Sequence, residues 1–198
     1  MVAYMYQDTI RDKLLKTLAH IGRILTKVTQ NSGPNGILSA PDLHKIAEGI
    51  FLSAWTHWEQ FTHYLLVEDL ASNNQSVLHR WITNFRTVNA CRYLSNQVLN
   101  HPDHPQKFID WSDYTAVVSR ANEFLGAGNR FAATPLPRRG DLELLRRVRN
   151  AVAHRSDKTQ KSFVRLYRNP PFSLQPLQMR GITPGRFLVA HIWHGQPI

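Results

Sequence analysis

Apolar side chains recur every three or four residues through most of the chain before residue 157, and this period constrains the fold more than any other feature. Residues with that spacing share one face of an α-helix, so each stripe predicts a helix that packs against a core. The stripes, and the Gly-, Pro- and Asn-rich breaks between them, predict helices at about residues 7–28, 39–70, 77–99, 112–125 and 141–156. We therefore expect an all-α fold, an antiparallel bundle of four to five helices.

Local signals mark three of these boundaries. Ser39, followed three residues later by Asp42, resembles a cap with a reach-back acid at the start of the second helix. Gly126 is a natural end for the fourth helix. The sequence TPLPRRG (134–140) is typical of a linker, which leaves Asp141 as the expected N-cap of the last helix.

The sequence after residue 156 differs in character from the rest. SFVRLYR (162–168) and RFLVAHIW (186–193) are rich in β-branched and aromatic residues, with Pro- and Gly-containing sequence between them. They favour either two paired strands or an irregular arm across the helices. We expect a helical bundle over residues 1–156 and a basic C-terminal extension over residues 157–198, packed on or beside it.

The positive charge is concentrated in one quarter of the chain. The formal net charge is +10, and residues 136–186 hold 12 of the 24 Lys and Arg residues but only three of the 14 Asp and Glu residues. Localised basic charge is typical of a protein that binds a polyanion. We favour nucleic acid over the alternatives, a solubilising face or an anionic membrane surface.

Bulk features indicate a soluble cytoplasmic protein. No apolar run approaches the roughly 20 residues needed to span a bilayer. The N-terminal segment has an acid by Asp8 and lacks the apolar core of a signal peptide. Cys91 is the single cysteine, so no internal disulfide can form, which fits a reducing compartment. We expect Cys91 to be a core residue rather than a nucleophile.

One face of the predicted helix at 141–156 carries candidate catalytic groups. Asn150 and His154 are four residues apart and share a face, with Arg146 one turn earlier. Arg149 and His154 are five residues apart, or about 140° around the axis, so one helix brings them together only by long side-chain reach. A second copy of the helix across a two-fold axis would place two arginines and two histidines around one cleft.

These residue types suit metal-independent cleavage of RNA. Guanidinium groups bind phosphate and stabilise the charge that develops during displacement at phosphorus. Imidazole can give or take a proton near neutral pH. RNA supplies its own nucleophile, the 2′-hydroxyl, so no metal is needed to generate one. The expected product carries a 2′,3′-cyclic phosphate.

The string RNAVAH (149–154) resembles the RNase motif of the HEPN superfamily, which lies late in a four- or five-helix bundle. AWTHWEQFTHYL (54–65) resembles the second helix of HEPN proteins of the RiboL-PSP type, in which an aromatic residue precedes an acidic one. The likeness in helix order covers about residues 5–156. It implies dimerisation through the motif helices and a role as a toxin, a phage-defence nuclease or an RNA-processing factor. The implied catalytic residues are Arg149, Asn150, His154 and Glu59.

The leading hypothesis is a homodimeric endoribonuclease of a toxin or phage-defence system, joined through the 141–156 helix, with no cofactor and with an antitoxin or defence-system protein as a partner. RNA is expected to bind the surrounding cations: Arg138, Arg139, Arg146, Arg147, Arg155, Lys158 and Lys161. The rival hypothesis is a non-catalytic module that binds RNA or a protein through the same basic tract. A metal site is not expected, because the histidines lack the cluster of further ligands that zinc needs. Most tryptophans are expected in the core, and Trp193 is the one candidate for base stacking.

Overall fold

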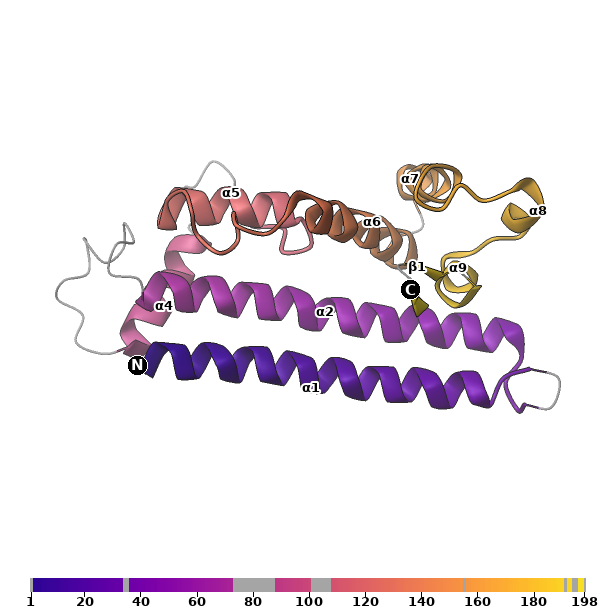
Figure 1. Cartoon of the computed structure of the whole chain (residues 1–198), viewed down its shortest axis with the longest axis horizontal. Coiled ribbons are helices and arrows are strands. Elements are labelled where there is room, and N and C mark those ends of the chain that lie inside the picture. The colour runs from indigo at the N-terminus through magenta and orange to yellow at the C-terminus, as the bar shows by residue number, and fades with distance from the viewer. Residues whose placement is uncertain are drawn as a thin grey trace. The chain divides into compact units, whose positions relative to one another are not determined.

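The computed structural model describes residues 2–33, 36–72, 88–100, 108–154, 156–190, 192–193 and 196–197. Helices make up most of this described part of the chain (Figure 1). In order they are α1 (Val2–Gln30), α2 (Ala40–Ser72), α4 (Val88–Leu99), α5 (Tyr114–Leu125), α6 (Leu136–Ala153), α7 (Asp157–Arg168), α8 (Pro176–Met179) and α9 (Pro184–Ala190). One two-stranded antiparallel ladder pairs β1 (Ile192–Trp193) with β2 (Gln196–Pro197). The prediction of an all-α protein is confirmed. Among the described helices, none has both the length and the hydropathy that a membrane span requires.

The chain forms two compact units, and each is built from two separate stretches of sequence. The first unit comprises residues 1–15 and 57–143, and the second comprises residues 16–56 and 144–198. Helices α1, α2 and α6 each contribute residues to both units. The residues after 156 therefore belong to the same unit as the end of α6.

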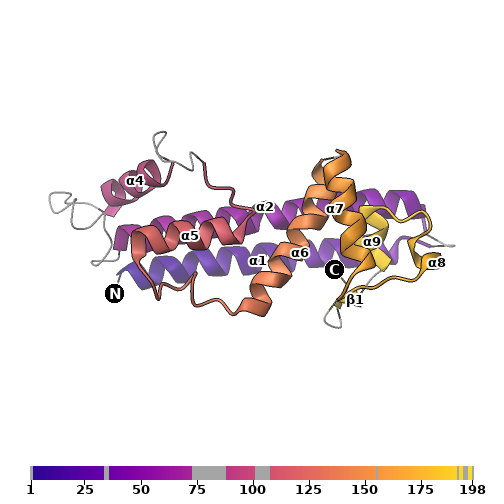
Figure 2. The ribbon, with the colours of Figure 1, turned by 90° about the horizontal axis from the view of Figure 1, so that it is seen from above.

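The core of the first unit joins the C-terminal half of α2 to α4 and α5. Its fully buried side chains include Leu66 and Leu70 of α2, Leu99 of α4 and Val117 of α5. Phe131, in the connection between α5 and α6, closes the cluster. In the view of Figure 2, α5 lies along this part of α2. Burial of these apolar side chains is the main source of the unit's stability.

Two carboxylates are buried beside that core. Glu68 is only 1% exposed, and its two oxygens accept from Nε and Nη2 of Arg92 at 2.6 and 3.1 Å. Asp69 lies 2.9 Å from Nε of Arg130. Burial raises the pKa of Asp69 to about 6, because the loss of hydration outweighs the opposing effect of the nearby Arg130 guanidinium.

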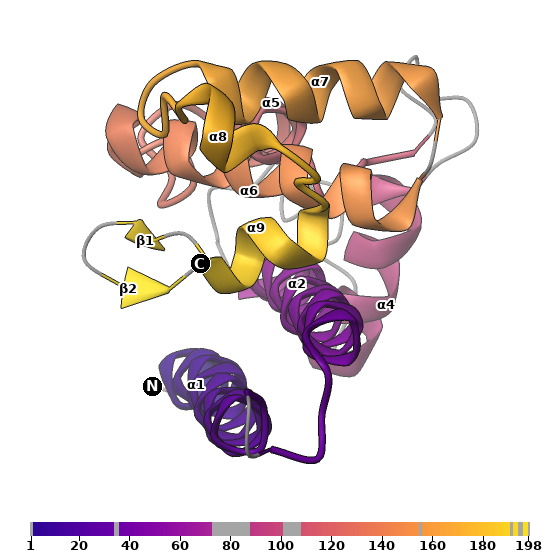
Figure 3. The same cartoon turned by 90° about the vertical axis from the view of Figure 1, so that its right-hand side faces the viewer.

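The second unit packs α7 and α9 against the end of α6 and the start of α2. Phe163 of α7 is 2% exposed, and its ring meets Phe187 of α9 edge-on, with centroids 5.5 Å apart. Val148 and Ala151 of α6 and Ala47 of α2 complete the buried cluster. Figures 1 and 3 both show α9 between α2 and α7.

The contact between α9 and α2 requires a glycine. The backbone N–H of Gly185 donates to Oε1 of Glu48 at 3.0 Å. A Cβ at position 185 would lie 2.3 Å from the carbonyl oxygen of His44, a separation that real Cβ atoms essentially never show. Only glycine allows the two backbones to come this close.

An apolar cavity of about 440 Å³ also lies in the second unit. Its walls come from α1, α2 and α9, and include Leu25, Phe51 and Leu188. None of the candidate catalytic residues lines it.

Two predicted helix boundaries are confirmed by their hydrogen bonds. Asp42 accepts from the backbone N–H of Ser39 at 3.1 Å and from its hydroxyl, as a reach-back cap requires. These bonds lower the pKa of Asp42. At the end of α5, the N–H of Gly126 donates to the carbonyl oxygen of Asn122 at 3.0 Å, with a φ of 78° at the glycine.

Two other sequence predictions are wrong. Residues 136–140 are the first residues of α6 rather than a linker, so Asp141 is not an N-cap. Proline is tolerated in the first turn of a helix, where its missing N–H would have had no partner. Residues 162–168 and 186–190 are helical rather than extended, because their apolar side chains pack into one buried cluster at helical spacing. Residues 77–87 of the predicted third helix lie outside the described residues.

Candidate functional site

The candidate site lies at the C-terminal end of α6. Val148 and Ala151 are buried, and Val152 packs against the same cluster, so this face of the last turn is fixed to the core of the second unit. Arg149 and Asn150 lie on other faces of the same turn and are half-buried. The helix ends at Ala153, and the exposed His154 follows it directly.

A single chain brings the three motif side chains together. Nη1 of Arg149 lies 3.1 Å from Oδ1 of Asn150 and 3.4 Å from Nε2 of His154. The long arginine side chain spans the five-residue separation, which is about 140° around the helix axis. The backbone N–H of His154 still donates to the carbonyl oxygen of Asn150, at 2.9 Å, which holds the residue close to the helix. The arginine–histidine pair therefore does not depend on a second copy of the chain.

This contact selects one form of the imidazole. A guanidinium group has hydrogen-bond donors and no acceptor. If the 3.4 Å contact between Arg149 and His154 is a hydrogen bond, Nε2 must accept it, and the ring proton is then on Nδ1. In that form the basic nitrogen of the imidazole points toward the group best suited to hold a phosphate.

The start of α7 fixes the backbone on the other side of His154. Ser156 is the N-cap of α7, and its hydroxyl oxygen accepts from the N–H of Thr159 at 3.3 Å. The hydroxyl of Thr159 is within hydrogen-bonding distance of the carbonyl oxygen of His154. Residues of both helices thus hold His154, which restricts where its imidazole can lie.

Three of the other predicted site residues lie in the first unit. Glu59 is half-buried on α2, and its catalytic role stays a prediction. Arg138 pairs with Asp141 at 3.6 Å. Arg139 donates from Nε to the carbonyl oxygen of Thr134 at 2.9 Å and from Nη2 to that of Ala132, so its guanidinium holds the turn that precedes α6.

The remaining predicted cations lie in the second unit. Arg146 and Arg147 are half-buried on α6, whereas Lys158 and Lys161 are exposed on α7. Arg155 lies outside the described residues. All of these were predicted to bind RNA, and their role stays a prediction.

Sequence reasoning missed two further cations on α7, Arg165 and Arg168, which are exposed. Both fall in the stretch that was predicted to be a strand or an arm. The available signal was the spacing, because Arg165 is four residues from Lys161 and Arg168 is three residues from Arg165, and cations at such intervals share a helix face.

His63, in the first unit, has a structural role. Nε2 of His63 lies 2.9 Å from Oδ1 of Asn96, and its ring packs on Trp111 with centroids 4.6 Å apart. Cys91 is half-buried on α4. Within the described ranges, no group of three or more His, Cys, Asp and Glu side chains has the geometry to hold a metal ion. The side chain of Trp193 lies outside what the structure describes.

Searches against protein-family models, curated proteins and solved structures find no match to this chain. The HEPN resemblance therefore stays a prediction, which depends on the two short motifs RNAVAH (149–154) and AWTHWEQFTHYL (54–65) and on the helix order.

Proposed function

We propose that this chain is a metal-independent endoribonuclease of the HEPN type that acts as a homodimer. The observation that supports this most is the contact of 3.4 Å between Nη1 of Arg149 and Nε2 of His154, with Asn150 on the same guanidinium. A phosphate-binding group and a proton-transfer group thus lie side by side at an accessible position, as cleavage of an RNA backbone requires.

In the proposed reaction, an imidazole takes the proton of a 2′-hydroxyl, and the resulting oxyanion attacks the adjacent phosphorus. The bond from phosphorus to the 5′-oxygen breaks, and that oxygen takes up a proton. The products are a 2′,3′-cyclic phosphate and a 5′-hydroxyl, with no net consumption of water. Arg149 holds a phosphate oxygen and stabilises the charge of the transition state, while Asn150 orients the guanidinium.

The dimer supplies the second proton-transfer group. One His154 can serve as the base, and its counterpart from the second chain can serve as the acid. Sedimentation equilibrium is expected to give twice the mass of the chain under assay conditions. If a monomer cleaves RNA with full activity, the proposal that the active form is a dimer is wrong.

The test is cleavage of RNA in the presence of EDTA by the wild type and by His154→Ala. General acid–base catalysis contributes roughly 10²- to 10⁴-fold, and we expect a loss of at least that order. His20→Ala, which removes an exposed histidine from α1, is the matched control and should cleave normally. Cyclic-phosphate ends identify the mechanism. Undiminished cleavage by His154→Ala would refute the assignment.

A second candidate function is a module that binds RNA without cutting it, and the exposed Lys158 and Lys161 favour it. Under this alternative, purified wild-type protein binds RNA in a strongly salt-dependent manner and yields no cyclic-phosphate product. A cellular assay separates the two. A nuclease toxin impairs growth on expression, the His154→Ala variant does not, and an antitoxin partner would relieve the effect.

A further inference from the structure

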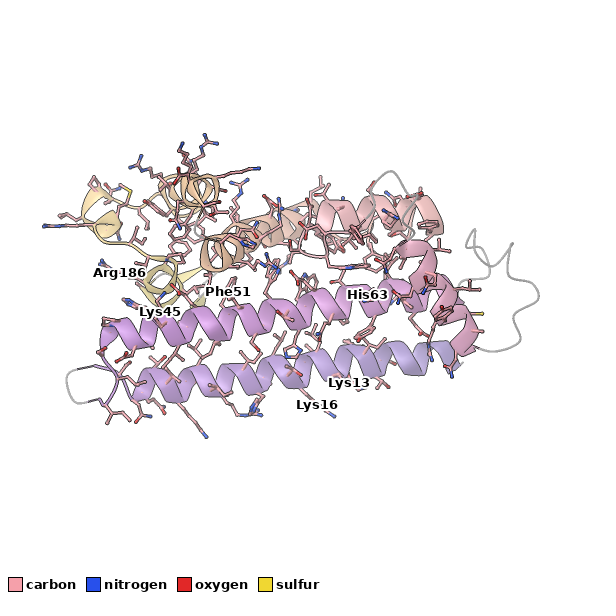
Figure 4. All side chains as sticks on the ribbon, turned by 180° about the vertical axis from the view of Figure 1, so that it is seen from behind. Lys13, Lys16, Lys45, Phe51, His63 and Arg186 are labelled. Carbon is pink, nitrogen blue, oxygen red and sulfur yellow. The ribbon has the colours of Figure 1, made fainter. Side chains whose placement is uncertain are left out.

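Helix α7 presents a continuous basic face to solvent. Its four cations follow one another at intervals of three, four and three residues, so they line one side of the helix: Lys158, Lys161, Arg165 and Arg168. All four are exposed. Figure 4 shows nitrogen-tipped side chains projecting from α7 on the side away from α9.

The opposite face of α7 fixes this orientation. Phe163, Leu166 and Tyr167 are buried in the core of the second unit. Rotation of α7 would expose these side chains to water, which opposes any arrangement that hides the cations. The basic face therefore points outward as a consequence of core packing.

No carboxylate of the described residues forms an ion pair with these four cations. Asp157 is the one acidic residue of α7. Like charges at intervals of three and four residues destabilise an isolated helix. A bound polyanion would relieve this repulsion along the whole length of α7.

The basic face is hollowed. A shallow depression of about 380 Å³ is lined by Lys161, Arg165 and Arg168 together with Asp157, Gln160 and Val164. The three cations give it the charge that a phosphate group needs. Gln160 adds a hydrogen-bonding group, and Val164 an apolar surface.

Helix α7, which carries the basic face, begins beside the candidate catalytic histidine. The hydroxyl of Thr159, in the first turn of α7, contacts the carbonyl oxygen of His154. At a rise of about 1.5 Å per residue, the face extends roughly 15 Å from Lys158 to Arg168. Each of the four cations along this length can contact one phosphate, so the face can hold about four phosphates of one strand.

We propose that the basic face of α7 is a backbone-binding track for the RNA substrate, which holds about four phosphates on one side of the scissile link. The inference deepens the proposed function and rests on it for the identity of the substrate. The track contacts phosphates and not base edges, so it binds without regard to sequence. It makes the preferred substrate a strand that continues at least four nucleotides beyond the cleaved bond.

The experiment measures RNA binding separately from cleavage. The probe is a fluorescein-labelled 12-nucleotide RNA with 2′-O-methyl groups throughout, which has no free 2′-hydroxyl and cannot be cut. Fluorescence anisotropy gives the Kd at salt concentrations between 50 and 200 mM. The α7 variant replaces Lys158, Lys161, Arg165 and Arg168 with Gln.

The matched α1 variant replaces four exposed cations elsewhere with Gln: Lys13, Lys16, Arg23 and Lys27. Both variants lose four positive charges, so they share one net charge. Lys13 and Lys16 project from the side of α1 away from α2 (Figure 4). Circular dichroism and urea unfolding establish that each variant is folded.

We expect the α7 variant, but not the α1 variant, to lose affinity for RNA and part of its salt dependence. Each phosphate contact to a single strand contributes about 0.7 to the slope of log K against log salt, so four lost contacts make the slope less negative by about 3. At 50 mM salt we expect the α7 variant to bind at least about tenfold more weakly than the wild type. The α1 variant should keep the wild-type slope.

Several results would contradict the proposal that α7 binds the RNA backbone. Equal losses in the α7 and α1 variants would show that net charge alone attracts RNA, and unchanged binding by the α7 variant would exclude α7. Vesicles containing phosphatidylserine form a third arm. If the α7 variant loses vesicle binding in a flotation assay but keeps RNA binding, α7 is a membrane-binding face instead.

Two double variants guard against misfolding of the fourfold variant. Lys158→Gln with Lys161→Gln, and Arg165→Gln with Arg168→Gln, should each change the salt slope by about half as much. A pair that leaves the slope unchanged would remove that end of α7 from the track. Failure of the nuclease proposal would appear only in the cleavage assay, since the probe here is not a substrate.

Discussion

Replacing Gly185 with alanine tests the packing of α9 on α2, which supports the second unit. The added Cβ would lie 2.3 Å from the carbonyl oxygen of His44, 2.8 Å from its carbonyl carbon and 3.0 Å from Oε1 of Glu48. The first two are backbone atoms and cannot rotate away. The helices must therefore separate by roughly 1 Å before the contact is acceptable.

The expected cost has two sources. Overpacking a well-packed contact costs typically about 1–3 kcal/mol. The same shift weakens the hydrogen bond of 3.0 Å from the N–H of Gly185 to Glu48, and a bond to a charged group contributes about 1.5–3 kcal/mol. Because one displacement causes both losses, we expect Gly185→Ala to lower the free energy of unfolding by about 2–4 kcal/mol.

Gly49→Ala is the matched control, because Gly49 lies on α2 and a Cβ there meets nothing within 4 Å. Alanine is a better helix former than glycine, so this variant should gain about 0.5–1 kcal/mol. Urea unfolding followed by circular dichroism measures both changes. A Gly185→Ala variant at least as stable as the wild type would show that α9 does not approach α2 as closely as described.

The remaining predictions concern one buried charge and one aromatic side chain. With its pKa raised from 3.8 to about 6, folded Asp69 takes up a proton that the unfolded chain does not, so this group should add up to about 3 kcal/mol of stability as the pH falls from 7 to below 4. Asp69→Asn should lack that contribution, and a pH series of urea titrations that gives the same slope for variant and wild type would exclude it. Phe163→Ala should lower the free energy of unfolding by about 3–5 kcal/mol, because the ring is buried on several sides. Phe108→Ala, at a residue that is 80% exposed, should stay within about 0.5 kcal/mol of the wild type, and similar losses in both variants would contradict the burial of Phe163.

Sequence patterns predicted the long helices well because their signals are local. Two examples are the reach-back cap at Ser39 and Asp42 and the glycine that ends α5. Both features depend on neighbouring residues alone, so a short stretch of sequence is enough to predict them. The conformation of residues 162–168 was harder to predict, because β-branched and aromatic side chains have only a weak preference for strands. Contacts with the distant Phe187 decide their conformation, and such contacts cannot be read from a short window.

The candidate site was predicted in composition but not in geometry. The motif named Arg149, Asn150 and His154, yet ideal helix angles placed the arginine and the histidine about 140° apart. The helix ends one residue before His154, and the arginine side chain reaches across, which no helical wheel represents. Arg165 and Arg168 were missed because the helix that carries them was not expected.

Each unit draws on two distant stretches of chain, and this limits how the protein can be divided. A fragment ending at residue 156 would keep the RNAVAH motif but lose Phe163, Leu166 and Phe187 from the core that supports it. No contiguous piece contains a whole unit without also containing part of the other. Dissection by point substitution in the intact 198-residue chain is therefore the appropriate route, and truncated versions should not be used to judge activity.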